Sequence, residues 1–184
     1  MADKESDFTE EELSSTPVFR GVLLQVYQDE VRLPDGRTAV REYVKHPGAA
    51  MMVALLDDGR VLLVRQFRYP LRRHFIEIPA GKIDAGEAPL DTAKRELREE
   101  CGYTAARWEH LTTIHPCIGY SDERIELYLA RGLEHVGHAP DEEEFLEVLA
   151  VPLMEALAWA RAGKITEVKA VIGLMLAAEA LRVA

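Results

Sequence analysis

The segment from Pro89 to Cys101 constrains the fold of this chain more than any other, because it carries helix signals along its length and at both ends. Proline suits the first turn of a helix, and a glycine such as Gly102 suits the position just beyond the last turn. Apolar residues recur along the segment at steps of three or four, which predicts one face packed into a core: Leu90, Ala93, Leu97 and Cys101. We therefore expect an amphipathic helix here.

Two carboxylates share a second face of this helix. Glu96 and Glu100 are four residues apart, and on an exposed helix such a like-charged pair costs roughly a few tenths of a kcal/mol. Lys94, Arg95 and Arg98 are interleaved with the glutamates, so composition by itself favours a solvated helix with many ion pairs. A magnesium ion would reverse the repulsion, because it selects hard oxygen ligands and shares its shell with substrate phosphates.

The spacing of residues around the helix decides between these interpretations. The marked positions, in chain order, are Gly81, Glu87, Arg95-Glu96-Leu97, Glu99-Glu100, Gly102 and Tyr103. This order resembles the Nudix box, in which a glycine, a glutamate, an Arg-Glu-aliphatic triplet, two adjacent glutamates and a second glycine stand at fixed intervals. The sequence departs from the box at its last position, where Tyr103 replaces an aliphatic residue, and this affects packing rather than the acidic positions.

The resemblance implies an α+β protein with the Nudix fold, which is an α/β/α sandwich around a mixed sheet, here preceded by N-terminal antiparallel strands. It also implies hydrolysis of a nucleoside diphosphate that is linked to another group. By the same resemblance, the metal ligands would be Glu96, Glu100 and the backbone carbonyl of Ala80. The metal would be Mg²⁺, with Mn²⁺ as an alternative.

The resemblance also assigns catalytic roles beyond these ligands. Arg95 would orient a carboxylate, either Glu87 or Glu99, and Glu99 would itself be a further acidic residue at the metal. Hydrolysis needs a base to activate the attacking water, and in the resembled enzymes a glutamate before a late strand has this role. Glu144 matches that position. Two neighbours remain open as alternatives: Glu142 and Glu143.

Motifs outside the box resemble the ADP-ribose pyrophosphatase branch of the family, from about Phe19 to Leu181. They are Arg41-Glu42, His46-Pro47-Gly48, Arg65-Gln66-Phe67-Arg68, Glu77-Ile78-Pro79-Ala80-Gly81, Pro116, Gly119 and Ser121-Asp122-Glu123. This branch implies hydrolysis of ADP-ribose to AMP and ribose 5-phosphate. Two alternatives remain open, namely another nucleoside diphosphate sugar such as GDP-mannose, and a sensor that binds ADP-ribose without cleaving it.

Three residues of these motifs are candidates for substrate binding. Arg68 would clamp the diphosphate, since an arginine beside a metal site suits a bidentate contact with phosphate. Arg41 would help to hold the adenosine half across a dimer, and Glu123 would bind substrate as well. The ordinary alternative is a solvated charge for either arginine and a strand cap for Glu123.

Hydrophobic periodicity and turn residues divide the chain into a flexible tail (1–15), an N-terminal strand section (16–47) and a larger domain (48–184). The resemblance implies that the strand section is a dimerisation arm and that the larger domain is the Nudix hydrolase domain. The expected strands are Phe19–Val31, Thr38–Lys45, Ala49–Leu56, Arg60–Phe67, Phe75–Ile78, Arg107–Ile114, Arg124–Arg131 and Phe145–Val151. Two helices are expected after them: Pro152–Ala162 and Glu167–Leu181.

Charge and composition exclude several classes of protein. The formal net charge is −10, and so strong an acidic excess argues against general binding to nucleic acid. The two cysteines, Cys101 and Cys117, match no zinc spacing or disulfide framework. The acidic start does not resemble a signal peptide, and the longest apolar run is far shorter than the roughly 20 residues of a membrane span. We therefore expect a cytoplasmic protein that does not bind nucleic acid or contact membranes. The resemblance implies in addition an enzyme that acts on a small nucleoside diphosphate sugar and forms a homodimer.

Overall fold

The computed structural model describes residues 7–137 and 145–183, which belong to two compact units. The N-terminal unit comprises Met1–His46 together with Cys117–Glu123. The main unit comprises Pro47–Pro116 and Arg124–Ala184. The first unit ends at His46, and it also takes a short loop from the middle of the chain.

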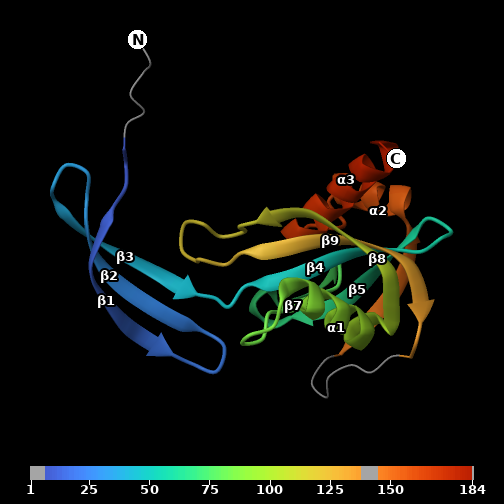
Figure 1. The fold of residues 1–184 in the computed structure, drawn as a ribbon, viewed down its shortest axis with the longest axis horizontal. Coiled ribbons are helices and arrows are strands. Elements are labelled where there is room, and N and C mark those ends of the chain that lie inside the picture. The colour runs from blue at the N-terminus through green and yellow to red at the C-terminus, as the bar shows by residue number, and fades with distance from the viewer. Residues whose placement is uncertain (1–6, 138–144, 184) are drawn as a thin grey trace, which may run out of the picture. The chain divides into compact units, whose positions relative to one another are not determined.

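Three antiparallel strands form the N-terminal unit (Figure 1). They are β1 (Glu11–Arg20), β2 (Gln25–Arg32) and β3 (Thr38–Lys45), in the order β1-β2-β3. The loop Cys117–Glu123 joins this sheet because the backbone N–H of Val44 donates to the carbonyl of Tyr120 at 2.8 Å. Val44 also pairs with Ser121 in a parallel bridge. The expected strand over Thr38–Lys45 is confirmed.

Two expectations for the N-terminal unit are wrong. Residues 11–15 do not belong to a tail, because β1 begins at Glu11 and pairs with β2 from that residue on. The single strand expected over Phe19–Val31 is instead the end of β1, a turn and most of β2. The turn closes with a 2.8 Å hydrogen bond from Gly21 N–H to the carbonyl of Leu24. Its apolar side chains concealed it in the sequence.

A seven-stranded mixed sheet forms the centre of the main unit. Its strands are β4 (Ala49–Leu55), β5 (Arg60–Arg68), β6 (Arg73–Glu77), β7 (Ala80–Lys82), β8 (Tyr103–Ile114), β9 (Ile125–His135) and β10 (Leu146–Pro152). The order along the main path is β10-β5-β4-β9-β8, while β6 pairs with β5 and β7 pairs with β4. The sheet is mixed because β4 and β9 run parallel and the other pairs are antiparallel.

Helices cover both faces of this sheet, so the expected α/β/α sandwich is confirmed (Figure 1). The helix α1 (Pro89–Cys101) packs on one face, and α2 (Leu153–Arg161) and α3 (Val168–Val183) pack on the other. The central strand β4 alternates between the two cores, with Met51 facing α2 and α3 and Met52 facing α1. Both side chains are fully buried, as a strand covered on both faces requires.

Most expected elements of the main unit lie within a few residues of the observed ones. The helix expected at Pro89–Cys101 has those bounds in the structure. The strands β8 and β9 extend beyond their expected bounds, and a 3₁₀ turn, η1 (Tyr69–Leu71), follows β5. The short strand β7 was not among the strands expected from the sequence. Among the described residues, no helix is long and apolar enough to cross a bilayer.

Candidate functional site

The helix α1 is held at both ends by the residues expected there. Pro89 occupies its first turn, and Gly102 ends it in the left-handed conformation, with φ 75°. The N-terminal end is reinforced from outside the helix, because the Thr92 hydroxyl donates to the Glu87 carboxylate at 2.7 Å. The apolar face of α1 contributes Ala93, Leu97 and Cys101 to the core, so the acidic positions of the helix have a fixed orientation.

Glu96 and Glu100 are buried, with only 8% and 4% of their surface exposed. Both carboxylates lie against β7. The Ala80 N–H donates to Glu100 Oε2 at 3.0 Å, and a Cβ added at Gly81 would collide with Glu96 Oε1. The close approach of Glu96 to the backbone therefore explains why position 81 is glycine. Two acidic side chains and one stretch of backbone thus converge at Ala80–Gly81.

Arg95 links three carboxylates on the outer side of this cluster. Its Nε and Nη2 each lie 3.1 Å from a Glu87 oxygen, while Nη1 donates to Glu96 at 2.8 Å and to Glu99 at 2.9 Å. Nη2 also reaches the carbonyl of Lys82 at 3.3 Å. The expected partners of Arg95 are thus in contact with it. Its catalytic role, and that of Glu99, remain predictions.

These contacts shift the pKa values of Glu87 and Arg95. The Arg95 guanidinium, followed by the Thr92 hydroxyl, lowers the pKa of Glu87 to about 2. The pairing with Glu87 in turn raises the pKa of Arg95 above its ordinary value. Glu87 is therefore ionised throughout the neutral range and holds Arg95 beside Glu96.

Arg68 lies on β5 and pairs with a glutamate that sequence reasoning did not select as a site residue. Its Nε and Nη2 donate to the two oxygens of Glu77 at 2.6 and 2.7 Å, and only 2% of the Glu77 side chain is exposed. The pairing raises the pKa of Arg68 above its ordinary value. Glu77 stands in the motif Glu77-Ile78-Pro79-Ala80-Gly81, and the available signal was a charged residue between two isoleucines, Ile76 and Ile78.

Two other substrate-binding candidates lie in the N-terminal unit. Arg41, on β3, pairs with Glu10, with Nε 2.8 Å from Glu10 Oε2. Glu123 lies 3.8 Å from His46 Nδ1 within the same unit. The contribution of either residue to the site therefore remains a prediction. The proposed base, Glu144, lies outside the described residues, as do its two alternatives.

The residues around Ala80–Gly81 fit a divalent cation in the chemistry of their donors. Carboxylate and carbonyl oxygens are the hard ligands that Mg²⁺ selects, and Mg²⁺ usually retains waters and substrate oxygens as well. Within the described part of the chain, no three His, Cys, Asp or Glu side chains form a group that could hold a metal by themselves. A cation here would thus need oxygens from the backbone and the substrate in addition to Glu96 and Glu100.

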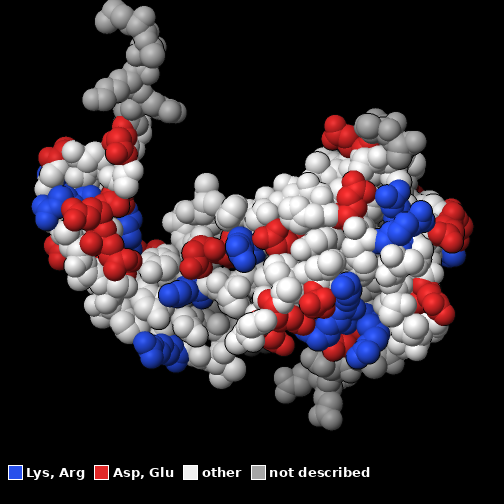
Figure 2. Space-filling model, viewed as in Figure 1, with Lys and Arg blue, Asp and Glu red and all other residues white. Residues whose placement is uncertain are grey.

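The surface around α1 carries both signs of charge. Figure 2 shows acidic and basic side chains intermixed over this part of the main unit. The described residues of the cluster account for the mixture, since Arg95 lies among Glu87, Glu96 and Glu99. Carboxylates therefore outnumber the guanidinium in the cluster, which suits a cation there rather than a bare anion.

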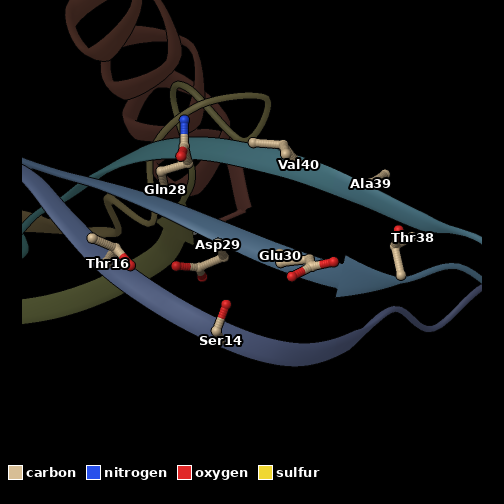
Figure 3. A pocket seen from close by; sticks show the side chains of 8 residues that line it. All are labelled: Ser14, Thr16, Gln28, Asp29, Glu30, Thr38, Ala39 and Val40. Atoms are coloured by element: carbon tan, nitrogen blue, oxygen red, sulfur yellow. The ribbon is translucent and has the colours of Figure 1, made fainter.

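A pocket of about 320 Å³ lies elsewhere, on the sheet of the N-terminal unit (Figure 3). It is lined mainly by hydroxyl, amide and acidic residues: Ser14, Thr16, Gln28, Asp29, Glu30, Thr38, Ala39 and Val40. Asp29 is buried, and its Oδ1 has no hydrogen-bond partner among the described residues. None of the residues that the sequence predicted for the site lines this pocket.

Comparison with known families gives two matches in adjoining parts of the chain. The model of the NUDIX domain matches residues 45–170, which span α1 and the sheet of the main unit. The model of the nucleoside diphosphate sugar hydrolase N-terminal domain matches residues 10–44, which span β1 to β3. The second match begins one residue before β1, in agreement with the observed start of the N-terminal sheet.

Individual relatives cover most of the chain. An ADP-ribose pyrophosphatase of Bacillus subtilis is 42% identical over 80% of this chain and 81% of its own. A methanol dehydrogenase activator of Bacillus methanolicus is 38% identical over 91% of both chains. The crystal structure of an ADP compounds hydrolase superposes with a TM-score of 0.87 over 97% of both chains at 24% identity, which supports the fold.

Proposed function

This chain is a member of the Nudix hydrolase family, and on that premise we propose that it hydrolyses ADP-ribose to AMP and ribose 5-phosphate in a reaction that requires Mg²⁺. The observation that carries the proposal is the convergence of buried Glu96 and Glu100 on the backbone at Ala80–Gly81. The similarity to an ADP-ribose pyrophosphatase over four fifths of the chain supports this substrate.

Glu96, Glu100 and the carbonyl of Ala80 would hold the cation in this proposal, with Mn²⁺ as an alternative to Mg²⁺. A bound cation would neutralise the charge that develops on the diphosphate and polarise a water molecule. Arg95 keeps Glu96 and Glu99 in place through its Nη1, and Arg68 would bind a phosphate oxygen. Glu144 would remove a proton from the attacking water.

A second nucleoside diphosphate sugar, such as GDP-mannose, is the alternative substrate. It is favoured by the match of residues 10–44 to the nucleoside diphosphate sugar hydrolase N-terminal domain, since that description names no particular sugar or base. Both substrates place a diphosphate at the same cluster. The two substrates differ in the base and the terminal sugar. Arg41 and Glu123 would help to bind these two groups.

A panel of nucleoside diphosphate sugars with Mg²⁺, with products identified by mass, tests the proposal. We expect ADP-ribose to give the highest kcat/KM and equal amounts of AMP and ribose 5-phosphate. A higher kcat/KM for GDP-mannose would replace the proposed substrate with the alternative. Binding of ADP-ribose without any product would instead indicate a sensor.

A homodimer is also part of the proposal, with the N-terminal unit as its interface. The end of β1 and the turn that follows it expose a group of apolar side chains that an isolated chain would leave in water: Val18, Phe19, Val22, Leu23 and Leu24. The strand β1 is exposed along its whole length. A second copy that covers these residues would remove both features. The cytoplasmic location predicted from the sequence remains a prediction.

A further inference from the structure

A buried carboxylate outside the box gathers cations from two distant parts of the chain. Glu77, at the end of β6, receives two hydrogen bonds from Arg68 of β5, and its Oε2 lies 3.8 Å from Lys169 Nζ at the start of α3. Lys169 is held a second time by Glu167, at 2.6 Å. Four charged groups, two of each sign, therefore meet at the junction of β5, β6 and α3.

The start of α3 is fixed at this junction by close packing. Gly173 lies one helical turn beyond Lys169, and a Cβ added there would come within 2.8 Å of Ile78 Cδ1. Ile78 follows Glu77 in the chain and is 1% exposed. The glycine thus lets α3 approach the segment that carries Glu77, which brings the lysine within reach of its carboxylate.

Glu77 and Arg68 differ in exposure, because the carboxylate is buried while its guanidinium partner still reaches solvent. The Glu77 side chain is 2% exposed, whereas that of Arg68 is 45% exposed. Burying a carboxylate is costly unless it is paired and hydrogen-bonded, so Glu77 must keep its cations close. Glu77 occupies Nε and Nη2 of Arg68, and Nη1 donates to no described residue, which leaves it for another acceptor.

The cluster lies next to the acidic site. Glu100 contributes to the raised pKa of Arg68 through its charge, so the two groups are electrostatic neighbours. The chain connects them as well, because Glu77 precedes Ala80 by three residues and Ala80 donates to Glu100. Cations fixed here stand beside the position at which the diphosphate would meet Glu96 and Glu100.

We infer that Glu77 is a positioning residue that fixes Arg68 and Lys169 as a pair of phosphate-binding cations at the acidic site. The inference rests on the proposed function, since the ligand is the diphosphate of a nucleoside diphosphate sugar. Glu77 does not touch the ligand. It acts by removing the freedom of two long side chains before the ligand arrives, which lowers the cost of binding.

The variants E77Q, R68A and E77Q/R68A test this inference, with K169M for the second cation. Hydrogen bonds between charged groups are stronger than those between neutral groups. We therefore expect E77Q and R68A each to raise KM about ten- to hundredfold, with a smaller change in kcat. K169M should raise KM by a smaller factor. The double variant should be no worse than R68A, because Glu77 acts through Arg68. E77D, which keeps the charge, should recover part of the loss. The control is E109Q, which removes the charge from an exposed glutamate paired with Arg131 at 3.2 Å.

Calorimetric titration of ADP-ribose into metal-free wild type and variants separates this inference from the proposed function. Weaker binding by E77Q supports the positioning role even if the wild type makes no product, in which case only the proposed hydrolysis fails. Wild-type affinity and KM in a folded E77Q would overturn the inference, as would losses that multiply in the double variant. A metal-free wild type that binds no ADP-ribose would overturn the inference alone, because the product assay with Mg²⁺ decides the proposed hydrolysis separately.

Discussion

At the scale of single residues, burial changes the meaning of the charges on α1. An exposed ion pair such as Lys94 and Asp91, 3.2 Å apart, contributes little to the stability of the fold because water screens it. Glu96 and Glu100 are instead largely removed from water, where two like charges are costly unless donors or cations meet them. The Arg95 guanidinium and the Ala80 N–H supply part of that compensation. A cation would supply more, so these two residues are the ones whose charge should matter most.

Replacing Glu100 with glutamine tests this directly. The amide oxygen of E100Q can still accept the hydrogen bond from Ala80, so we expect a folded protein with its melting temperature little changed. Turnover should fall by on the order of 10²–10³, which is typical for the loss of one electrostatic contributor. The control is E109Q, on the exposed edge of β8. Wild-type turnover in E100Q would remove Glu100 from the site.

The base is the least constrained residue of the proposal. If Glu144 activates the attacking water, E144Q should lower kcat by about 10²–10⁴ and leave KM nearly unchanged, because a base acts in the chemical step. The matched control is E147Q, a glutamate three residues later whose side chain is 59% exposed and pairs with Arg65. Full activity in E144Q would direct the search to Glu142 and Glu143.

Glu87 gives a prediction about pH. Its pKa is about 2 in the folded chain and near the ordinary 4.5 when unfolded, so between these values the unfolded chain binds more protons. The stabilisation of the folded state by ionised Glu87 is therefore complete above pH 4.5 and is lost as pH falls towards 2. Urea unfolding followed by the fluorescence of Trp108 and Trp159 should show that E87Q is less stable than wild type at pH 6, with the difference shrinking below pH 4.5. A difference independent of pH would contradict the assignment.

At the scale of elements, the three-residue strand β7 places the site. It pairs with β4 through Ala49, Ala50 and Met51, and so lies in the sheet beneath α1. Its backbone meets Glu100 at Ala80 and Glu96 at Gly81. A helix with the same charges but without this strand would carry an ordinary solvated face.

Gly81→Ala tests this contact between β7 and α1. The added Cβ meets the far end of the Glu96 side chain, which can swing away, and φ at Gly81 is not in the left-handed region. We expect the fold to survive while activity falls by on the order of 10² because Glu96 is displaced. In an E96Q background the same substitution should cost little more. Wild-type activity in G81A would show that the position of Glu96 does not matter.

At the scale of the whole molecule, two units have different surfaces. The main unit buries both faces of its sheet beneath helices. The N-terminal unit has a three-stranded sheet with exposed apolar residues at its β1–β2 turn. Exposed apolar groups of this kind usually mark an interface, which is why we assign the dimer contact to this unit.

Sedimentation velocity of V22D/L23D tests the dimer. We expect wild type to sediment as a dimer and the variant as a monomer, because two charges in the interface would each need solvation. The control is M154D, which places a charge at an exposed apolar residue of α2. Equal dimerisation of all three proteins would exclude the β1–β2 turn, and a monomeric wild type would exclude the homodimer.

The family, the fold class and the helix α1 with its bounds could be predicted from the sequence, because box spacing, helix periodicity and end signals are local properties that persist in any context. The sequence did not reveal the turn at Gly21–Leu24, since an apolar turn does not break the pattern of a strand. The role of Glu77 also required the tertiary structure, because burial and the approach of α3 are not local. Pro89–Cys101 was thus predictable as a helix, whereas the convergence of Glu96 and Glu100 on Ala80–Gly81 depended on the pairing of β7 with β4.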